Sequence, residues 1–182
     1  AWCFRAAGVD LRGLPVDAEG IRIPEGREAG VPRLVYCTPA SQMPLGMPMS
    51  LARRDALLAA TARHHAWIVE DDYDSEYRYG TRPFPTLFES DPAGRVIYLG
   101  TFSKTLFPGM RIGFAILPEA LVDVVTAARL VSSWHPPTLE QYALAEFIET
   151  GAFARHVRRS RARYAERAGV LAESCTRWLP DP

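Results

Sequence analysis

Four short apolar segments constrain the fold more than any other feature of this chain. They are residues 33–37, 66–71, 95–100 and 112–117, and the first three lie about thirty residues apart. Segments with helical periodicity separate these three. Strands that alternate with helices in this way predict βαβ units and a mainly parallel sheet, because a parallel connection must cross over the sheet and needs a dozen or more residues.

The last interval in this series is different. Only about ten residues separate Gly100, at the end of the third segment, from Ile112, at the start of the fourth. That length is too short for a parallel crossover. We therefore expect the strand Ile112–Leu117 to run antiparallel to its neighbours.

The remaining sequence predicts six further elements. Residues 2–8 resemble the last turn of a helix that ends at a glycine, and Val9–Val16 resembles a weak strand. Ser50 is a suitable N-cap for a helix with an apolar face of Leu51, Leu57, Leu58 and Thr61. Later helices are expected from Pro118 to about Arg129, from Thr138, whose spacing to Gln141 fits a capping box, and from Phe153 to Ser174.

Composition is that of an ordinary globular domain. The chain has 182 residues, 48% hydrophobic and 23% charged, with a net charge of zero, so no overall electrostatic attraction to nucleic acid or membrane is expected. Cys3, Cys37 and Cys175 show neither disulfide-framework nor zinc-site spacing, which suits a cytoplasmic protein. We find no apolar run of membrane-spanning length and no signal peptide, and both ends resemble cuts within a longer protein.

Lysine usage points to one residue. The chain has twenty arginines and a single lysine, Lys104. An arginine stays protonated in proteins, whereas a lysine amine can lose its proton and attack a carbonyl, as it does with pyridoxal phosphate. The alternative is that an arginine-rich composition left one lysine by chance. The residues around Lys104 decide between a functional lysine and a chance one.

Polar residues follow two of the predicted strands, at the sheet edge where ligands of parallel sheets bind. The segment Glu70–Glu76 follows one strand, and Thr101, Ser103, Lys104 and Arg111 follow the other. Pyridoxal phosphate needs an amine for its aldehyde, a carboxylate for its ring nitrogen, a donor for its 3-oxygen and a cradle for its phosphate. The corresponding candidates are Lys104, Asp71, Tyr73, and the group Thr101, Ser103 and Arg111.

Four sequence blocks resemble the aminotransferase-like domain of MocR/GabR-type bacterial regulators, which are fold-type-I relatives of class I aminotransferases. The blocks are Thr38–Gly46, Glu70–Glu76, Gly100–Gly113 and His135–Gln141. The loop block departs from the family pattern at Ser41 and Leu45, which leaves the role of Gln42 open.

The resemblance implies a three-layer α/β/α large domain, mainly parallel with one antiparallel strand and truncated at both ends. Residues 1–150 would be part of the cofactor-binding domain, and residues 151–182 a helix toward a missing small domain. It implies that Lys104 forms the Schiff base with pyridoxal 5'-phosphate, that Asp71 pairs with the ring nitrogen, that Tyr73 contacts the 3-oxygen, and that Thr101, Ser103 and Arg111 lie at the phosphate.

The implied parent protein is a homodimeric transcriptional regulator that senses an amine or amino acid and contacts DNA through a domain absent from this chain. A free-standing class I aminotransferase is the alternative, and an incomplete fragment without stable activity is a second one. No membrane partner is expected.

Other interpretations of single features remain. The acidic segment Glu70–Glu76 could hold Mg²⁺ or Ca²⁺, or its members Asp72, Asp74 and Glu76 could be solvated while Glu70 points to the opposite sheet face. The run Arg158–Arg163 could contact nucleic acid, but on a helix it would form a solvated face with Val157 and Tyr164 pointing inward.

Overall fold

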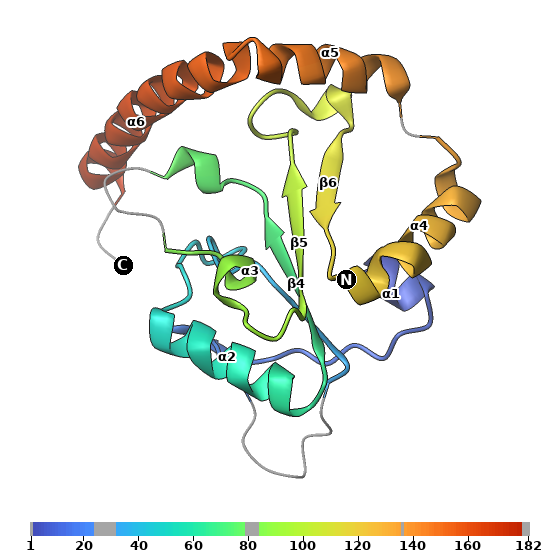
Figure 1. The fold of residues 1–182 in the computed structure, drawn as a ribbon. Helices are drawn as coiled ribbons and strands as arrows, with labels where there is room; N and C mark the ends of the chain where they lie inside the picture. The colour runs from blue at the N-terminus through green and yellow to red at the C-terminus, as the bar shows by residue number, and fades with distance from the viewer. Residues whose placement is uncertain (1, 24–31, 79–83, 136, 180–182) are drawn as a thin grey trace. The chain divides into compact units, whose positions relative to one another are not determined.

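The computed structural model describes residues 2–23, 32–78, 84–135 and 137–179 (Figure 1). The chain divides into two compact units, which are described separately. The first comprises Ala1–Asp71 with Pro85–Ile97, and the second comprises Asp72–Phe84 with Tyr98–Pro182. Residue Pro136 of the fourth family block and residues 180–182 lie outside the described residues.

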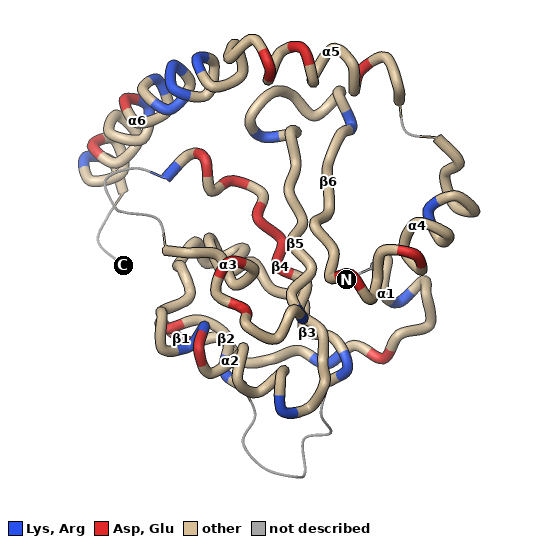
Figure 2. The backbone as a smooth tube through the Cα atoms, viewed as in Figure 1, with Lys and Arg blue, Asp and Glu red and all other residues tan. Residues whose placement is uncertain are grey.

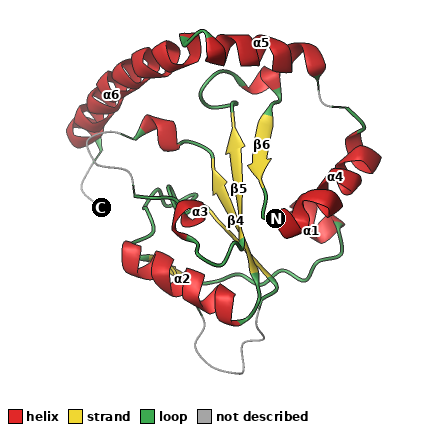
Figure 3. Cartoon of the chain, in the orientation of Figure 1, coloured by secondary structure: helices red, strands yellow, loops and turns green. Residues whose placement is uncertain are grey.

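The expected strands form a four-stranded sheet in the order β3-β4-β5-β6. These strands are β3 (Leu34–Cys37), β4 (Trp67–Asp72), β5 (Val96–Thr101) and β6 (Gly113–Ile116), drawn as arrows in Figure 3. β3 and β4 are parallel, and β5 and β6 are antiparallel with Gly100 opposite Phe114. The predicted α/β class, with a mainly parallel sheet and an antiparallel last strand, is confirmed.

The first unit packs helix α2 (Leu51–Arg63) on a buried apolar cluster that includes Val35, Ile68 and Val96. Ser50 caps this helix as predicted, because its hydroxyl accepts from the Arg53 N–H. Leu57, Leu58 and Thr61 are buried. Leu51 is 49% exposed, so its assignment to the buried face was wrong: it occupies the first turn, beyond the part of α2 that faces the cluster.

A short helix that the sequence did not predict, α3 (Leu87–Ser90), begins on a buried carboxylate. Glu70 is 1% exposed and accepts hydrogen bonds from the N–H groups of Leu87 and Phe88, at 3.0 and 2.9 Å. Thr86 and Glu89 form a capping box at the same end. Glu70 is therefore a structural residue, which satisfies helix N–H groups that have no intrahelical partner.

The strand expected at Val9–Val16 is wrong. That segment is irregular, and only Val16 takes part in a strand, β1 (Val16–Asp17), which pairs with β2 (Gly20–Ile21) in a two-stranded antiparallel sheet. Gly20 has a φ of 108°, and a Cβ there would lie 2.9 Å from Cγ of Met49, so a larger residue would not fit. Helix α1 (Trp2–Ala6) does end near a glycine, Gly8, as predicted.

The second unit contains the three long helices α4 (Glu119–Ser133), α5 (Thr138–Glu149) and α6 (Ala152–Trp178), together with the short helices η1 (Ser75–Tyr77) and η2 (Pro108–Met110). The capping box at Thr138 is wrong. Pro137 is the N-cap and provides no side-chain bond, and the Gln141 side chain donates to the Pro137 carbonyl instead. The φ of Pro137, −65°, is fixed by its ring and is compatible with the start of a helix.

Helix α6 carries the arginine run as an exposed face. Figure 2 shows basic residues along much of the helix, and Arg158, Arg159, Arg161 and Arg163 are all exposed. Val157 is half-buried, whereas Tyr164 is 41% exposed but packs edge-on against Tyr77. None of the helices in the described ranges is both long and apolar enough to cross a membrane.

Replacement of Arg54 by methionine should strongly destabilise the first unit. Arg54 is 4% exposed and donates to the carbonyls of Met49, Pro85 and Pro39, at 3.0, 2.9 and 2.7 Å. The substitution would leave these buried acceptors without their donor, so we expect a loss of about 3 kcal/mol or more in the free energy of unfolding. Urea denaturation would measure it, and Arg63→Met, at an exposed site on the same helix, should change stability by less than about 0.5 kcal/mol.

Cys37 should resist thiol reagents until the chain unfolds. Burial, reinforced by the charge of Glu70, raises the pKa of the Cys37 thiol to about 12, so the reactive thiolate is absent at pH 8. The exposed thiols of Cys3 and Cys175 should react at once and serve as internal controls. Rapid native labelling of Cys37 would contradict the structure.

Because the unfolded Cys37 thiol ionises near pH 9 and the folded one only near pH 12, the free energy of unfolding should fall as pH rises above 9.

Candidate functional site

The only lysine lies in a tight turn that directly follows β5. The Leu106 N–H donates to the Phe102 carbonyl at 2.9 Å and closes the turn, and the Ser103 N–H donates to the Thr101 hydroxyl at 3.2 Å. Lys104 is exposed, whereas the next residue, Thr105, is 1% exposed. The turn therefore has a fixed interior side and presents the lysine on its outer side.

The connection from β5 to β6 keeps the other predicted phosphate-side residues on the same short segment. The Phe102 N–H donates to the Ile112 carbonyl at 3.1 Å, which extends the β5–β6 ladder beyond the strands. Arg111 precedes Ile112 and is exposed. Thr101, Ser103, Lys104 and Arg111 thus lie at one end of this antiparallel pair, which carries hydroxyl, amine and guanidinium groups.

Arg111 adopts an uncommon backbone conformation. Its φ of 52° and ψ of 34° place it in the left-handed region at the end of η2. A residue with a Cβ pays a conformational cost there of about 1 kcal/mol. Such strained positions concentrate at functional sites, so Arg111 is a candidate on backbone as well as chemical grounds.

The second unit also contains Tyr73 and a partly buried acidic group. Asp72 is 6% exposed; its Oδ2 accepts from the Tyr98 hydroxyl at 2.8 Å, while its Oδ1 has no partner among the described residues. Burial and then the charge of Asp72 raise the pKa of the Asp74 carboxyl, and burial also raises that of Glu76. The alternative that these carboxylates are simply solvated is therefore wrong for Asp72, which is buried, whereas Asp74 and Glu76 are half-buried.

Asp71 belongs to the first unit, at the end of β4. Its carboxylate accepts a hydrogen bond from the hydroxyl of Tyr36, which lies on the neighbouring strand β3. Tyr36 in turn contacts the Phe4 ring edge-on, with centroids 5.9 Å apart. Tyr36 was not predicted from the sequence, although it lies only two residues before the Thr38–Gly46 block, which is a usable signal.

Gln42, also in the first unit, has an unsatisfied buried atom. Its side-chain oxygen Oε1 is buried without a hydrogen-bond partner in the described part of the chain. Its backbone is fixed, since its N–H donates to the Met47 carbonyl at 2.9 Å. A buried polar atom without a hydrogen-bond partner destabilises the fold, so the Gln42 Oε1 atom is available to accept a hydrogen bond from a ligand.

The structure thus places five of the six predicted site residues in the second unit and Asp71 in the first. Within the second unit, four of the five share the β5–β6 connection. In the described ranges, no group of three or more His, Cys, Asp or Glu residues is arranged to hold a metal ion.

Comparison with known proteins assigns the chain to a family. The family model described as "Aminotransferase class I and II" matches residues 16–179. The probable rhizopine catabolism regulatory protein MocR of Rhizobium meliloti is 48% identical over 97% of this chain, and the uncharacterized HTH-type transcriptional regulator YhdI of Bacillus subtilis is 42% identical over 94%.

A solved structure supports the same assignment. The α-aminoadipate aminotransferase LysN of Thermus thermophilus, complexed with N-(5'-phosphopyridoxyl)-L-leucine, superposes with a TM-score of 0.82 at 32% identity, over 97% of this chain and 47% of its own. The chain spans 36% of the length of each of the two regulators. From the sequence blocks, the fold and these matches together, the chain belongs to the aminotransferase class I and II family.

Proposed function

We propose that this chain is the pyridoxal-phosphate-binding, aminotransferase-like part of a MocR-type transcriptional regulator. In this proposal Lys104 is the residue that binds the cofactor covalently, as a Schiff base. The observation that carries the proposal is the single lysine of the chain, exposed on the turn that follows β5 and flanked by Thr101, Ser103 and Arg111. The regulators that match nearly the whole chain at 42–48% identity support the regulatory setting.

The residues present fit pyridoxal phosphate. The β5–β6 connection offers an amine, two hydroxyls and a guanidinium, which match an aldehyde and a phosphate. The first unit offers the Asp71 carboxylate for a protonated ring nitrogen, and the unsatisfied Gln42 amide for a polar group of the ligand. When bound, the cofactor supplies an aldehyde that captures amines and a ring that accepts electrons.

Each residue then has a definite role. Lys104 holds the cofactor and, once an amine substrate displaces it, its free amine can carry a proton. Asp71 keeps the proton on the ring nitrogen, and Tyr36 fixes the orientation of the Asp71 carboxylate by donating to it. Tyr73 donates to the 3-oxygen, while Thr101, Ser103 and Arg111 hold the phosphate.

At the level of the whole protein, we propose a cytoplasmic homodimer that responds to an amine or amino acid and binds DNA through a segment outside this chain. Residues 1–150 would belong to the cofactor-binding domain and residues 151–182 to a helix leading to a small domain. The similarity to LysN keeps a free-standing aminotransferase as a second candidate. Specific DNA binding by the full-length protein, altered by an amino acid, would separate the first candidate from the second.

Lys104→Arg should abolish covalent capture of the cofactor while preserving the positive charge. The full-length protein that carries this chain would be incubated with pyridoxal phosphate, reduced with borohydride and analysed by peptide mapping. We expect a stoichiometric adduct on Lys104 in the wild type and none at position 104 in the variant.

The matched control for this experiment is Arg63→Lys, which adds an amine at an exposed site on α2. That new lysine should stay unlabelled at stoichiometric cofactor, because capture depends on the surrounding site. An adduct at another residue, or none at all in a folded wild-type protein, would rule out the role of Lys104. Absence of any adduct would also favour a fragment or protein without stable cofactor binding.

Asp71→Asn should leave the adduct on Lys104 but slow any exchange of amino groups with an amino acid by about tenfold or more, since the ring nitrogen would lose its anionic partner. Stopped-flow absorbance of the cofactor would measure the rate. Asp72→Asn is the control: it removes the neighbouring charge, and the amide oxygen can still accept from Tyr98. Equal rates in the wild type and Asp71→Asn would show that another residue faces the ring nitrogen.

A further inference from the structure

The main-chain carbonyl that follows the lysine is held by two side chains. The Thr105 carbonyl accepts from the Tyr77 hydroxyl at 3.3 Å and contacts Nε2 of His156 at 2.8 Å. Thr105 lies one peptide unit after Lys104 and is buried, whereas Lys104 is exposed. The turn is therefore anchored on its interior side, directly beside the residue that presents the amine.

The contact with the Thr105 carbonyl determines which ring nitrogen of His156 carries a hydrogen. A carbonyl oxygen only accepts, so Nε2 must carry the hydrogen in this contact. The neutral tautomer with a hydrogen on Nε2 and the charged ring both satisfy that condition, so the contact survives either protonation state of Nδ1. The Ser160 hydroxyl lies 3.5 Å from the same nitrogen, which is a weak additional contact.

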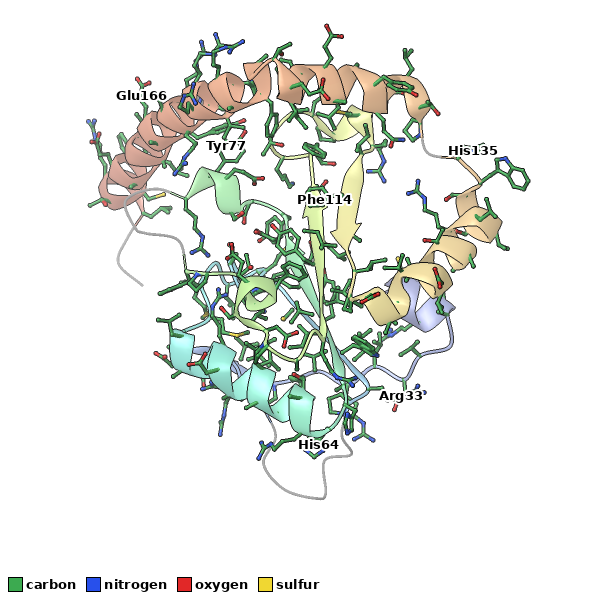
Figure 4. The ribbon with its side chains drawn as sticks, in the orientation of Figure 1. Arg33, His64, Tyr77, Phe114, His135 and Glu166 are labelled. Atoms are coloured by element: carbon green, nitrogen blue, oxygen red, sulfur yellow. The ribbon has the colours of Figure 1, made fainter. Side chains whose placement is uncertain are left out.

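One face of α6 carries the anchoring residues. Phe153, His156, Ser160 and Tyr164 are spaced by three or four positions and therefore share a helix face. Phe153 meets Phe102, the first residue of the turn, with ring centroids 5.8 Å apart. Tyr164 meets Tyr77 with centroids 5.0 Å apart, and Figure 4 shows Tyr77 between η1 and α6. The helix thus contacts the turn at Phe102 and Thr105 and contacts η1 through Tyr77.

We propose that His156, assisted by Tyr77, is a positioning residue for Lys104. This inference rests on the proposed role of Lys104. The two hydrogen bonds at the Thr105 carbonyl tie the turn to α6 and η1, so the lysine backbone is held before the cofactor arrives. Without them the turn keeps its Leu106–Phe102 bond but loses this attachment, and ordering it would oppose capture of the aldehyde.

The test compares variants of the full-length protein that carries this chain. Pyridoxal phosphate is titrated, trapped with borohydride, and the labelled fraction of Lys104 is measured by peptide mapping. We expect His156→Ala to raise the cofactor concentration for half-labelling by about tenfold. His156→Gln should recover most of the loss, because its amide can donate to the same carbonyl. Arg159→Ala, at an exposed site on the same helix, should match the wild type.

A second readout needs no cofactor. Hydrogen exchange of the 102–106 amides should be faster in His156→Ala than in the wild type, and near the wild-type rate in His156→Gln. If wild-type Lys104 takes no label, the proposed function fails, and this exchange measurement alone then decides whether His156 holds the turn.

The proposal is overturned if a folded His156→Ala protein shows wild-type labelling and exchange, or if His156→Gln behaves like His156→Ala. Should His156→Ala fail to fold, Tyr77→Phe decides. It removes one donor to the Thr105 carbonyl and keeps the ring against Tyr164. A two- to threefold loss of Lys104 labelling would support the proposal, and unchanged labelling would refute it.

Discussion

The short connection between β5 and β6 is the constraint on which the candidate site depends. It is too short to cross over the sheet, so β6 must return antiparallel beside β5. That return brings Arg111 back beside the turn that holds Lys104, and the Phe102–Ile112 hydrogen bond closes the ladder at this point.

Buried polar groups join separate segments within each of the two units. The Glu70 carboxylate accepts hydrogen bonds from the first N–H groups of α3, and Arg54 donates to three main-chain carbonyls. The Thr105 carbonyl accepts from the side chains of Tyr77 and His156. Each of these groups is withdrawn from water and is paired with backbone of another segment. Such pairings are expensive to break, because the partner left behind is also buried. They therefore fix the positions of loops that hydrophobic packing alone would leave loose.

The acidic segment shows how adjacent residues acquire different roles. Glu70 is structural, Asp71 is held by Tyr36, and Asp72 is held by Tyr98, although the three are consecutive. Alternation along β4 places Asp71 on the face opposite to Glu70 and Asp72. Glu70 and Asp72 share a face but lie two residues apart along the strand, and their partners come from different segments. The assignment of Asp71 to the ring nitrogen remains a prediction, but the structure gives its carboxylate a specific donor.

The sequence by itself determined the α/β class, the principal strands and helices, the antiparallel return of the last strand and the segments that carry Lys104 and Arg111. Periodicity, capping residues and the length of a connection are local properties, so they can be read along the chain. Only the tertiary structure revealed Tyr36, Tyr77 and His156 as partners, because each contacts a residue 28 to 51 positions away. It also corrected the strand at Val9–Val16 and the capping box at Thr138, where local propensity was outweighed by packing and by the backbone of the neighbouring residues.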